Sequence, residues 1–194
     1  MSETKNPTLI QHLKNLTDTY LALFPDEAAR INCLLNEITS NSQLDLRSTM
    51  TGHVTGTAIV IKGDEILFLH HNILDRWLCP GGHFDLEDEL MDITSLRELV
   101  EETGIDKKYL HLHTWHKKNN MSPIDIDIHT IPTNIKKNEG KHLHFDFRYV
   151  FNIDNDFTHQ LQLDEVSNLK WLKVQDIDNS FSIFPAKEKL LKLL

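Results

Sequence analysis

The first quarter of the chain repeats apolar side chains every three to four positions, which is the spacing of an amphipathic helix. The first run consists of Leu9, Ile10, Leu13 and Leu16. A second run extends from Ala28 to Ile38, and Pro25 between the two suits the first turn of a helix. We therefore predict two helices within residues 7–46. Their apolar stripe needs a cover, either the main domain or a second subunit in a homodimer.

From about His53 the apolar period shortens to two, which is the spacing of a β-strand. Lys62 to Glu65 is predicted to form a tight hairpin turn between the first two strands. The predicted strands are residues 57–61, 66–69, 110–115, 124–129, 142–151 and 168–172. Residues 185–194 are predicted as an amphipathic helix. This mixture favours a layered α/β domain at residues 49–194, preceded by a helical extension at residues 1–48.

A further helix is predicted before Gly104, a residue suited to the left-handed position that follows a helix. Its buried face is expected to consist of Leu90, Ile93, Leu96 and Val100. Three carboxylates, Glu98, Glu101 and Glu102, fall on one narrow arc of this helix, because residues three and four apart are neighbours. Such crowding is unfavourable unless a cation lies against it. Mg²⁺ suits the arrangement, because it prefers oxygen ligands shared between carboxylates and substrate phosphates.

The residues from Arg97 to Ile105 read Arg-Glu-Leu-Val-Glu-Glu-Thr-Gly-Ile, and a Pro-Gly-Gly-His turn at 80–83 precedes them. This block resembles the Nudix box, which has a Gly, five residues, a Glu, seven residues and then Arg-Glu-apolar-x-Glu-Glu-x-Gly-apolar. The second half matches throughout. The first half has one extra residue, so counting back from Arg97 places the first acid at Glu89, whereas counting forward from Gly82 places it at Asp88.

The resemblance implies an α/β/α sandwich with a mixed sheet, and hydrolysis of a diphosphate linkage in a nucleoside diphosphate derivative. It implies Mg²⁺, with Mn²⁺ as a substitute, held by Glu98, Glu101, Glu102 and the Gly82 carbonyl. Arg97 would orient these acids, and Glu98 is the first choice of general base, with Glu165 second. A Nudix-fold module that binds or regulates without cleaving is the alternative function. An isomerase is less well supported, because no second catalytic partner for Cys79 is evident.

The predicted strand after Gly140 carries polar residues at alternate positions, which therefore share one face: His142, His144, Asp146 and Arg148. A hairpin could bring them against a second alternating row, Asp125, Asp127 and His129. One interpretation is a substrate pocket, to which Arg76 would also contribute. The competing interpretation is a solvent-facing sheet surface. A third treats His142, His144 and Asp146 as a transition-metal site, because imidazole and carboxylate suit Zn²⁺ or Fe²⁺.

Composition narrows the class of partner. The net charge of −9 argues against a nucleic-acid-binding surface, which needs basic patches, and leaves a small anionic substrate whose charge a bound metal would offset. The two cysteines are too few for a disulfide framework. No apolar run reaches membrane-spanning length and the polar start lacks a secretory signal, so we expect no membrane partner and a cytoplasmic location.

Overall fold

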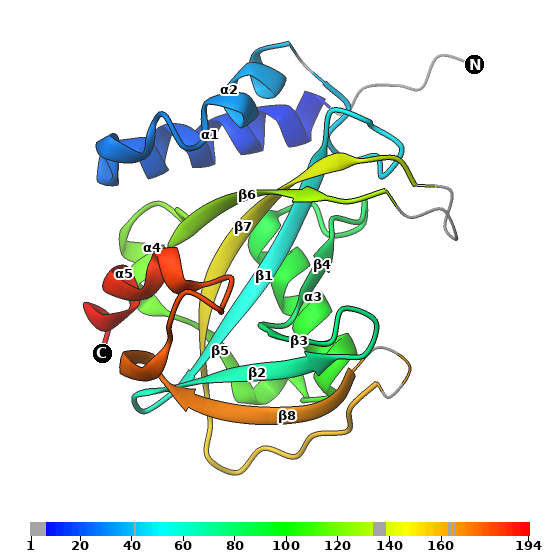
Figure 1. Cartoon of the computed structure of the whole chain (residues 1–194). Coiled ribbons are helices and arrows are strands. Elements are labelled where there is room, and N and C mark those ends of the chain that lie inside the picture. Colours follow the sequence, from blue (N-terminus) through cyan, green and yellow to red (C-terminus); the bar gives the residue numbers. More distant parts are fainter. Residues whose placement is uncertain (1–6, 41, 134–138, 163, 165) are drawn as a thin grey trace.

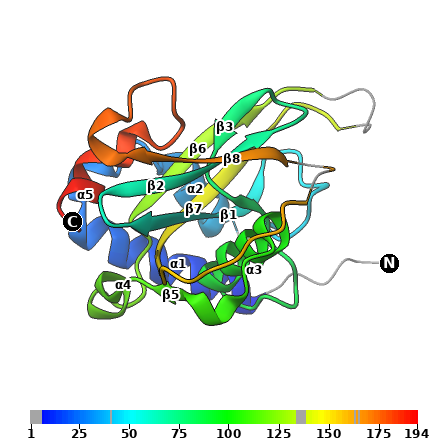
Figure 2. The same ribbon diagram turned by 90° about the horizontal axis from the view of Figure 1, so that it is seen from below.

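The computed structural model describes the chain except residues 1–6, 41, 134–138, 163 and 165. Its described part contains a mixed sheet of eight strands, in which β3, β2, β1, β7 and β5 follow one another (Figure 1). Off this path, β4 pairs with β1, β6 with β7, and β8 with β2, and Figure 2 shows β8 (orange) alongside β2. The strands are β1 (His53–Lys62), β2 (Glu65–His71), β3 (Arg76–Leu78), β4 (Gly81–His83), β5 (Leu110–Leu112), β6 (Asp125–Ile131), β7 (His142–Ile153) and β8 (Val166–Lys173).

The centre of the sheet is the parallel pair β1 and β7, which stay in register from His53 opposite His144 to Ile61 opposite Asn152. Alternation along β1 divides its side chains between two cores. Ala58 and Val60 belong to one apolar cluster, whereas Ile59 and Ile61 belong to a second cluster on the other face. Both faces of this pair are therefore covered, as expected for parallel strands.

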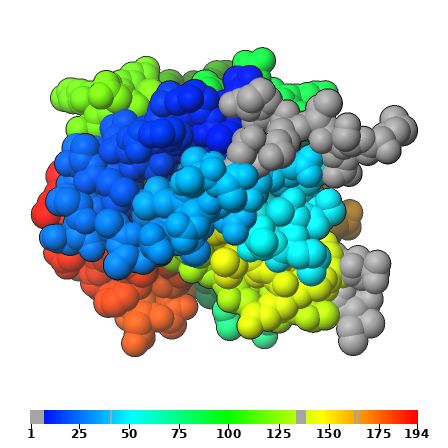
Figure 3. Space-filling model, turned by 90° about the horizontal axis from the view of Figure 1, so that it is seen from above, coloured from blue at the N-terminus to red at the C-terminus, as the bar shows by residue number. Residues whose placement is uncertain are grey.

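Helices cover both faces, which confirms the predicted α/β layering. On one face, α1, α2 and α3 pack into the core that contains Ala58, and in Figure 3 the two N-terminal helices (blue) cover much of the surface seen from above. On the other face, Leu190 of α5 packs with Ile59. The helices are α1 (Pro7–Leu23), α2 (Asn32–Thr39), α3 (Met91–Thr103), α4 (Thr114–Lys118) and α5 (Lys187–Leu191), with 3₁₀ turns η1 (Pro25–Glu27), η2 (Lys107–Tyr109), η4 (Val174–Asp176) and η5 (Phe184–Ala186).

The N-terminal extension is packed on the main domain. Leu9, Leu13, Leu16 and Tyr20 of α1 are at most 3% exposed and share a core with β1 and β7. The apolar stripe predicted from the sequence thus finds its cover within the same chain. The domain boundary near residue 48 stays a prediction.

The predicted buried face of α3 is partly wrong. Leu90 and Ile93 are 42% and 41% exposed, and the residues that face the sheet include Thr94, Ser95 and Glu102. The reason lies on β1, where a Cβ at Gly56 would meet Ser95 and Thr94 within about 3 Å. The helix therefore approaches the strand closely through Thr94 and Ser95, whereas Met91 and Leu99 are the side chains that it buries in the apolar core. The predicted helix end is confirmed, since Gly104 is left-handed at φ 63°.

Two other segments differ from expectation. The strand predicted for residues 110–115 ends at Leu112, because His113 caps a new helix by accepting a hydrogen bond from the Trp115 amide at its Nδ1 (3.2 Å). Residues 185–194 form a 3₁₀ turn followed by the short helix α5 rather than one continuous helix. Strands β3 and β4 were not predicted, since three residues are too few for a period of two to be visible.

Candidate active site

Arg97 of α3 connects the helix to the loop before it. Its Nε and Nη2 donate to the two carboxylate oxygens of Asp88 at 2.9 and 3.0 Å. Its Nη2 also donates to the His83 carbonyl of β4 at 2.7 Å. Asp88 is 5% exposed and accepts a further hydrogen bond from the Asp85 amide. Of the two acids that the sequence left open, Asp88 is therefore the one paired with Arg97.

The extra residue of this loop is accommodated at Glu89. Its φ of 59° lies in the left-handed region, which a residue other than glycine rarely adopts. The side chain of Glu89 is exposed, so the additional residue bulges toward solvent. This conformation leaves Asp88 in place against Arg97 and lets α3 begin at Met91.

The three glutamates of α3 differ in surroundings. Glu98 lies so close to β4 that a Cβ at Gly82 would overlap its carboxylate, and Arg97 Nη1 donates to its Oε1 at 3.0 Å. Glu102 is 7% exposed and accepts from the Gly81 amide at 3.1 Å. Glu101 has a side chain 52% exposed and accepts from Arg97 at 3.1 Å. One guanidinium thus contacts two of the acids while β4 borders the other side.

Burial and ion pairing act on these acids in opposite directions. Burial raises the pKa of Glu98, although the positive charge of Arg97 opposes the shift. For Asp88 the balance is reversed, because the hydrogen bonds from Arg97 outweigh burial and hold its pKa below the ordinary value. Asp88 thus stays ionised against Arg97, whereas burial favours the protonated form of Glu98.

The donor set suits a hard divalent cation. The acids of α3 offer only carboxylate oxygens, and because residue 82 is a glycine the Glu98 carboxylate can lie directly against the β4 backbone. Oxygen ligands in this number are those that Mg²⁺ or Mn²⁺ prefers, with water and substrate completing the shell. Glu98, Glu101, Glu102 and the Gly82 carbonyl are the candidates to hold it.

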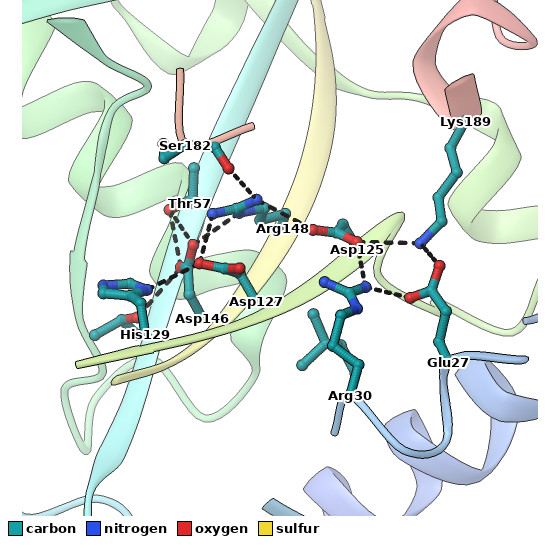
Figure 4. A network of polar contacts seen from close by, with 12 residues as sticks. Glu27, Arg30, Thr57, Asp125, Asp127, His129, Asp146, Arg148, Ser182 and Lys189 are labelled. Carbon is teal, nitrogen blue, oxygen red and sulfur yellow. Dashed lines mark hydrogen bonds and ion pairs between the residues drawn. The ribbon is translucent and has the colours of Figure 1, made fainter. Parts of the chain in front are cut away.

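The polar rows of β6 and β7 do face each other, as predicted. Asp125 is paired with Arg148, Asp127 with Asp146, and His129 with His144. Asp125, Asp146 and Arg148 form the buried centre of a polar network, which extends to Asp127 and to the exposed His129 (Figure 4). Arg148 is 1% exposed and forms ion pairs with Asp146 at 2.9 Å, Asp127 at 3.0 Å and Asp125 at 3.1 Å. Around Arg148 this face is therefore buried rather than solvent-facing, whereas its His129 end is exposed.

Two of the predicted substrate residues are fully engaged in this network. Asp146 accepts hydrogen bonds from Thr57 at 2.8 Å and from Arg148 at 2.9 Å. The remaining Arg148 donors point at aspartates and at the Ser182 carbonyl. Direct contact with substrate stays a prediction for both, but their observed contacts organise the sheet.

The network also includes residues from the N-terminal helical segment and from α5. Asp125 Oδ1 lies 2.7 Å from Arg30 Nη2 and 3.1 Å from Lys189 Nζ (Figure 4). Glu27 pairs with Arg30 and, at 2.6 Å, with Lys189. Asp125 therefore joins the segment between α1 and α2, the central sheet and α5.

His142 and His144 lie at the other end of the same polar face, with two histidines that the sequence analysis did not single out. His53 of β1 and His83 of β4 have rings whose centroids lie 4.7 and 5.0 Å from the His144 ring. No local spacing could have identified them, because the three strands are distant in the sequence. From the sequence alone, each of the two is only a single histidine at the end of a strand.

The remaining residues singled out in the sequence are Arg76, Glu165 and Cys79. Arg76 is exposed and, with Trp77 and Phe181, lines a hollow of about 400 Å³. Glu165 lies outside the described residues. Cys79 is buried, and burial raises the pKa of its thiol to about 12, so a catalytic thiolate of the isomerase type is disfavoured. Among the described helices, none has the length and apolarity needed to cross a membrane.

Comparison with known proteins gives consistent results. The family model for the NUDIX domain matches residues 52–194. A curated relative, the probable DHNTP pyrophosphohydrolase of Lactococcus lactis subsp. cremoris, is 32% identical over 120 residues. That alignment covers 61% of this chain and 66% of the relative, slightly under two thirds of its length.

Two solved structures are similar over a comparable part of the chain. A hydrolase of the NUDIX family from Clostridium perfringens is 22% identical, with a TM-score of 0.49, and the match covers 73% of this chain and 98% of that one. The dihydroneopterin triphosphate pyrophosphohydrolase of E. coli is 15% identical, with a TM-score of 0.47, covering 72% and 92%.

Proposed function

Because this chain belongs to the NUDIX family, we propose that it hydrolyses a diphosphate linkage in a small nucleotide-type substrate with the help of Mg²⁺. The observation that carries the proposal is that Glu98 and Glu102 contact β4 at Gly82 and Gly81, while Arg97, fixed by Asp88, contacts Glu98 and Glu101. The carboxylates of α3 are therefore within reach of one strand, one guanidinium or both.

Metal binding is assigned to Glu98, Glu101, Glu102 and the Gly82 carbonyl. A bound Mg²⁺ would neutralise charge on the phosphate oxygens and lower the pKa of the attacking water. Arg97 keeps Glu98 and Glu101 oriented through its 3.0 and 3.1 Å contacts. These contacts also reduce the repulsion between the two acids when the site is empty of cation.

Glu98 is proposed as the general base. Burial raises the pKa of its carboxyl group, and a base is most effective when its pKa approaches the working pH. Its carboxylate lies against Gly82 of β4, where a Cβ would overlap it. Arg97, held by Asp88, acts as a positioning residue for the cluster. Glu165 stays a second candidate for the base.

Dihydroneopterin triphosphate is the first substrate to test, because the curated relative is named for activity on it. Specificity between this compound and ordinary nucleotides would have to come from residues outside α3. The hollow lined by Arg76 and Trp77 is one such region, since an arginine beside an aromatic ring can meet a phosphate or stack on a heterocycle.

The test is a product assay on the purified full chain with Mg²⁺. Dihydroneopterin triphosphate, nucleoside triphosphates, nucleotide sugars and dinucleotides are incubated in turn, and phosphorus NMR identifies the products. Release of pyrophosphate or of a phosphomonoester supports hydrolysis. A substrate that binds in calorimetry but is never cleaved would instead identify a binding module.

Glu101→Gln and Glu102→Gln test the metal assignment. We expect each to remove most of the Mg²⁺-dependent turnover, by about 100-fold or more, because an amide is a much weaker ligand for a hard cation. Glu87→Gln in the exposed loop is the matched control and should retain wild-type turnover. Full activity in either α3 variant would overturn the assignment.

A further inference from the structure

We propose that His53, His83 and His144 form a binding site for one Zn²⁺ ion, separate from the carboxylates of α3. One ring nitrogen from each histidine lies within 4.8 Å of those from the other two. The residues come from three different strands, β1, β4 and β7. This is the type of geometry in which three imidazoles share a cation and leave a fourth position open.

The backbone of the sheet fixes this arrangement. His53 is directly opposite His144 in the parallel pair of β1 and β7, and His83 is opposite Thr55, two residues further along β1. The His53 ring centroid lies 5.0 Å from that of His83 and 4.7 Å from that of His144. Ligands placed on paired strands are held more rigidly than ligands placed on loops.

His53 gives the strongest indication that something is bound there. It is 2% exposed, and within the described part of the chain neither of its ring nitrogens has a hydrogen-bond partner. A buried polar group without a partner costs free energy, so native structures rarely leave one unexplained. Burial also lowers the pKa of His53 to about 4, which keeps the ring neutral at pH 7. Neutral imidazole is the form that ligates metals.

His142 lies beside this group and is the candidate for the fourth position, although the set of nitrogens within 4.8 Å of one another does not include it. Its Nδ1 donates to the Gly140 carbonyl at 2.8 Å, which leaves the Nε2 lone pair facing His144 Nε2 at 3.3 Å. Two ring nitrogens this close need a proton or a cation between them. Zn–N bonds of about 2.0 Å in a tetrahedron place neighbouring ligand nitrogens about 3.3 Å apart. A backbone carbonyl on the second ring nitrogen is also the usual support for a metal-binding histidine.

The ligands distinguish this site from that of α3. Imidazole nitrogens favour Zn²⁺ over Mg²⁺, whereas the glutamates favour the reverse. The three proposed ligands also differ from the transition-metal site considered from the sequence, which consisted of His142, His144 and Asp146. In the structure Asp146 accepts hydrogen bonds from Thr57 and Arg148 instead. A Zn²⁺ ion here would clamp β4 to β1 and β7. Since His83 directly follows Gly82, the clamp would steady the strand that borders Glu98.

The experiment is a Co²⁺ titration of the full chain, prepared without a histidine tag and stripped with EDTA. Tetrahedral Co²⁺ absorbs visible light far more strongly than octahedral Co²⁺, so the His site reports separately from the carboxylates. We expect one equivalent to give this absorption and Zn²⁺ to abolish it by competition. His53→Gln and His144→Gln should each lose it. The exposed His111→Gln and the α3 variant Glu102→Gln should keep it.

Folding of each variant is checked by circular dichroism, and the partly exposed His83→Gln provides a second ligand variant if His53→Gln does not fold. X-ray absorption on the zinc-loaded wild type counts the ligands directly, with three or four imidazoles expected. An octahedral cobalt spectrum, an absorption unchanged in His144→Gln, or fewer than three nitrogen ligands would overturn the proposal. No substrate is present, so the outcome is independent of the proposed hydrolysis.

Discussion

Arg97 and Asp88 form a two-point ion pair across the loop that carries one extra residue, with N···O distances of 2.9 and 3.0 Å. The contact holds even though the sequence count from Arg97 points to Glu89. Since Glu89 takes the left-handed conformation with φ of 59°, the loop absorbs the additional residue beside the pair rather than within it.

Asp88→Asn is therefore expected to lower kcat/KM about 10- to 100-fold, because the amide cannot accept both guanidinium hydrogen bonds and Arg97 loses its anchor. The apparent affinity for Mg²⁺ should fall in parallel. The measurement is turnover as a function of Mg²⁺ concentration. Glu89→Gln is the matched control with little expected effect. Equal losses in the two variants would contradict the assignment of Asp88.

Gly82→Ala should abolish most turnover without unfolding the protein. The new Cβ would occupy the position of the Glu98 carboxylate and force it away from β4. Gly63→Ala is the comparison, because its Cβ meets nothing within 4 Å and the cost is confined to a φ of 61°. We expect that variant to lose about 1 kcal/mol of stability and no activity. Steady-state kinetics and urea unfolding separate the two effects, and an active Gly82→Ala protein would refute the close packing.

Asp125→Asn should destabilise the fold by about 3 to 5 kcal/mol, because it removes the negative charge that Arg148, Arg30 and Lys189 share in a buried place. Urea unfolding followed by tryptophan fluorescence measures the change. Asp18→Asn breaks the exposed pair with Lys14 and is expected to cost less than about 0.5 kcal/mol. A similar small cost for Asp125→Asn would mean that the network adds little to stability.

We predict that the buried side chain of His116 contributes to destabilisation of the fold at acid pH. Its ring is fully buried, its Nδ1 donates to the Ser122 carbonyl at 2.7 Å, and its Nε2 accepts from the Val150 amide at 2.8 Å. Burial lowers its pKa from 6.5 to about 4. As the pH falls, His116 is therefore protonated in the unfolded chain before it is protonated in the folded protein. Its contribution to the free energy of unfolding is complete above pH 6.5 and is lost as the pH falls toward 4.

The expected size of that contribution is about 3 kcal/mol at neutral pH. Urea unfolding between pH 4 and 7 measures it as the slope of the free energy of unfolding against pH. His116→Gln should show a shallower slope than wild type by up to one proton, whereas the exposed His111→Gln should keep the wild-type slope. Identical slopes for wild type and His116→Gln would rule out the predicted titration.

Patterns along the sequence predicted those elements that a single continuous segment determines. The helix from Met91 to Thr103, its end at Gly104 and the facing rows of β6 and β7 all follow from spacing along the chain. Three features could not be found this way. The orientation of α3 depends on its close approach to Gly56, a residue on another element. The histidine cluster needs strands that are distant in sequence. The pairing of Asp88 with Arg97 depends on the left-handed backbone conformation of Glu89, which the residue type does not predict.

The parallel pairing of β1 with β7 has a consequence for the nascent chain. His53 finds its partner only at His144, so the central pair cannot form until most of the chain has been synthesised. Until then the apolar stripe of α1, which packs against these strands, has no surface to rest on. During synthesis the apolar stripe of α1 would therefore stay exposed to non-native contacts until β7 has been made.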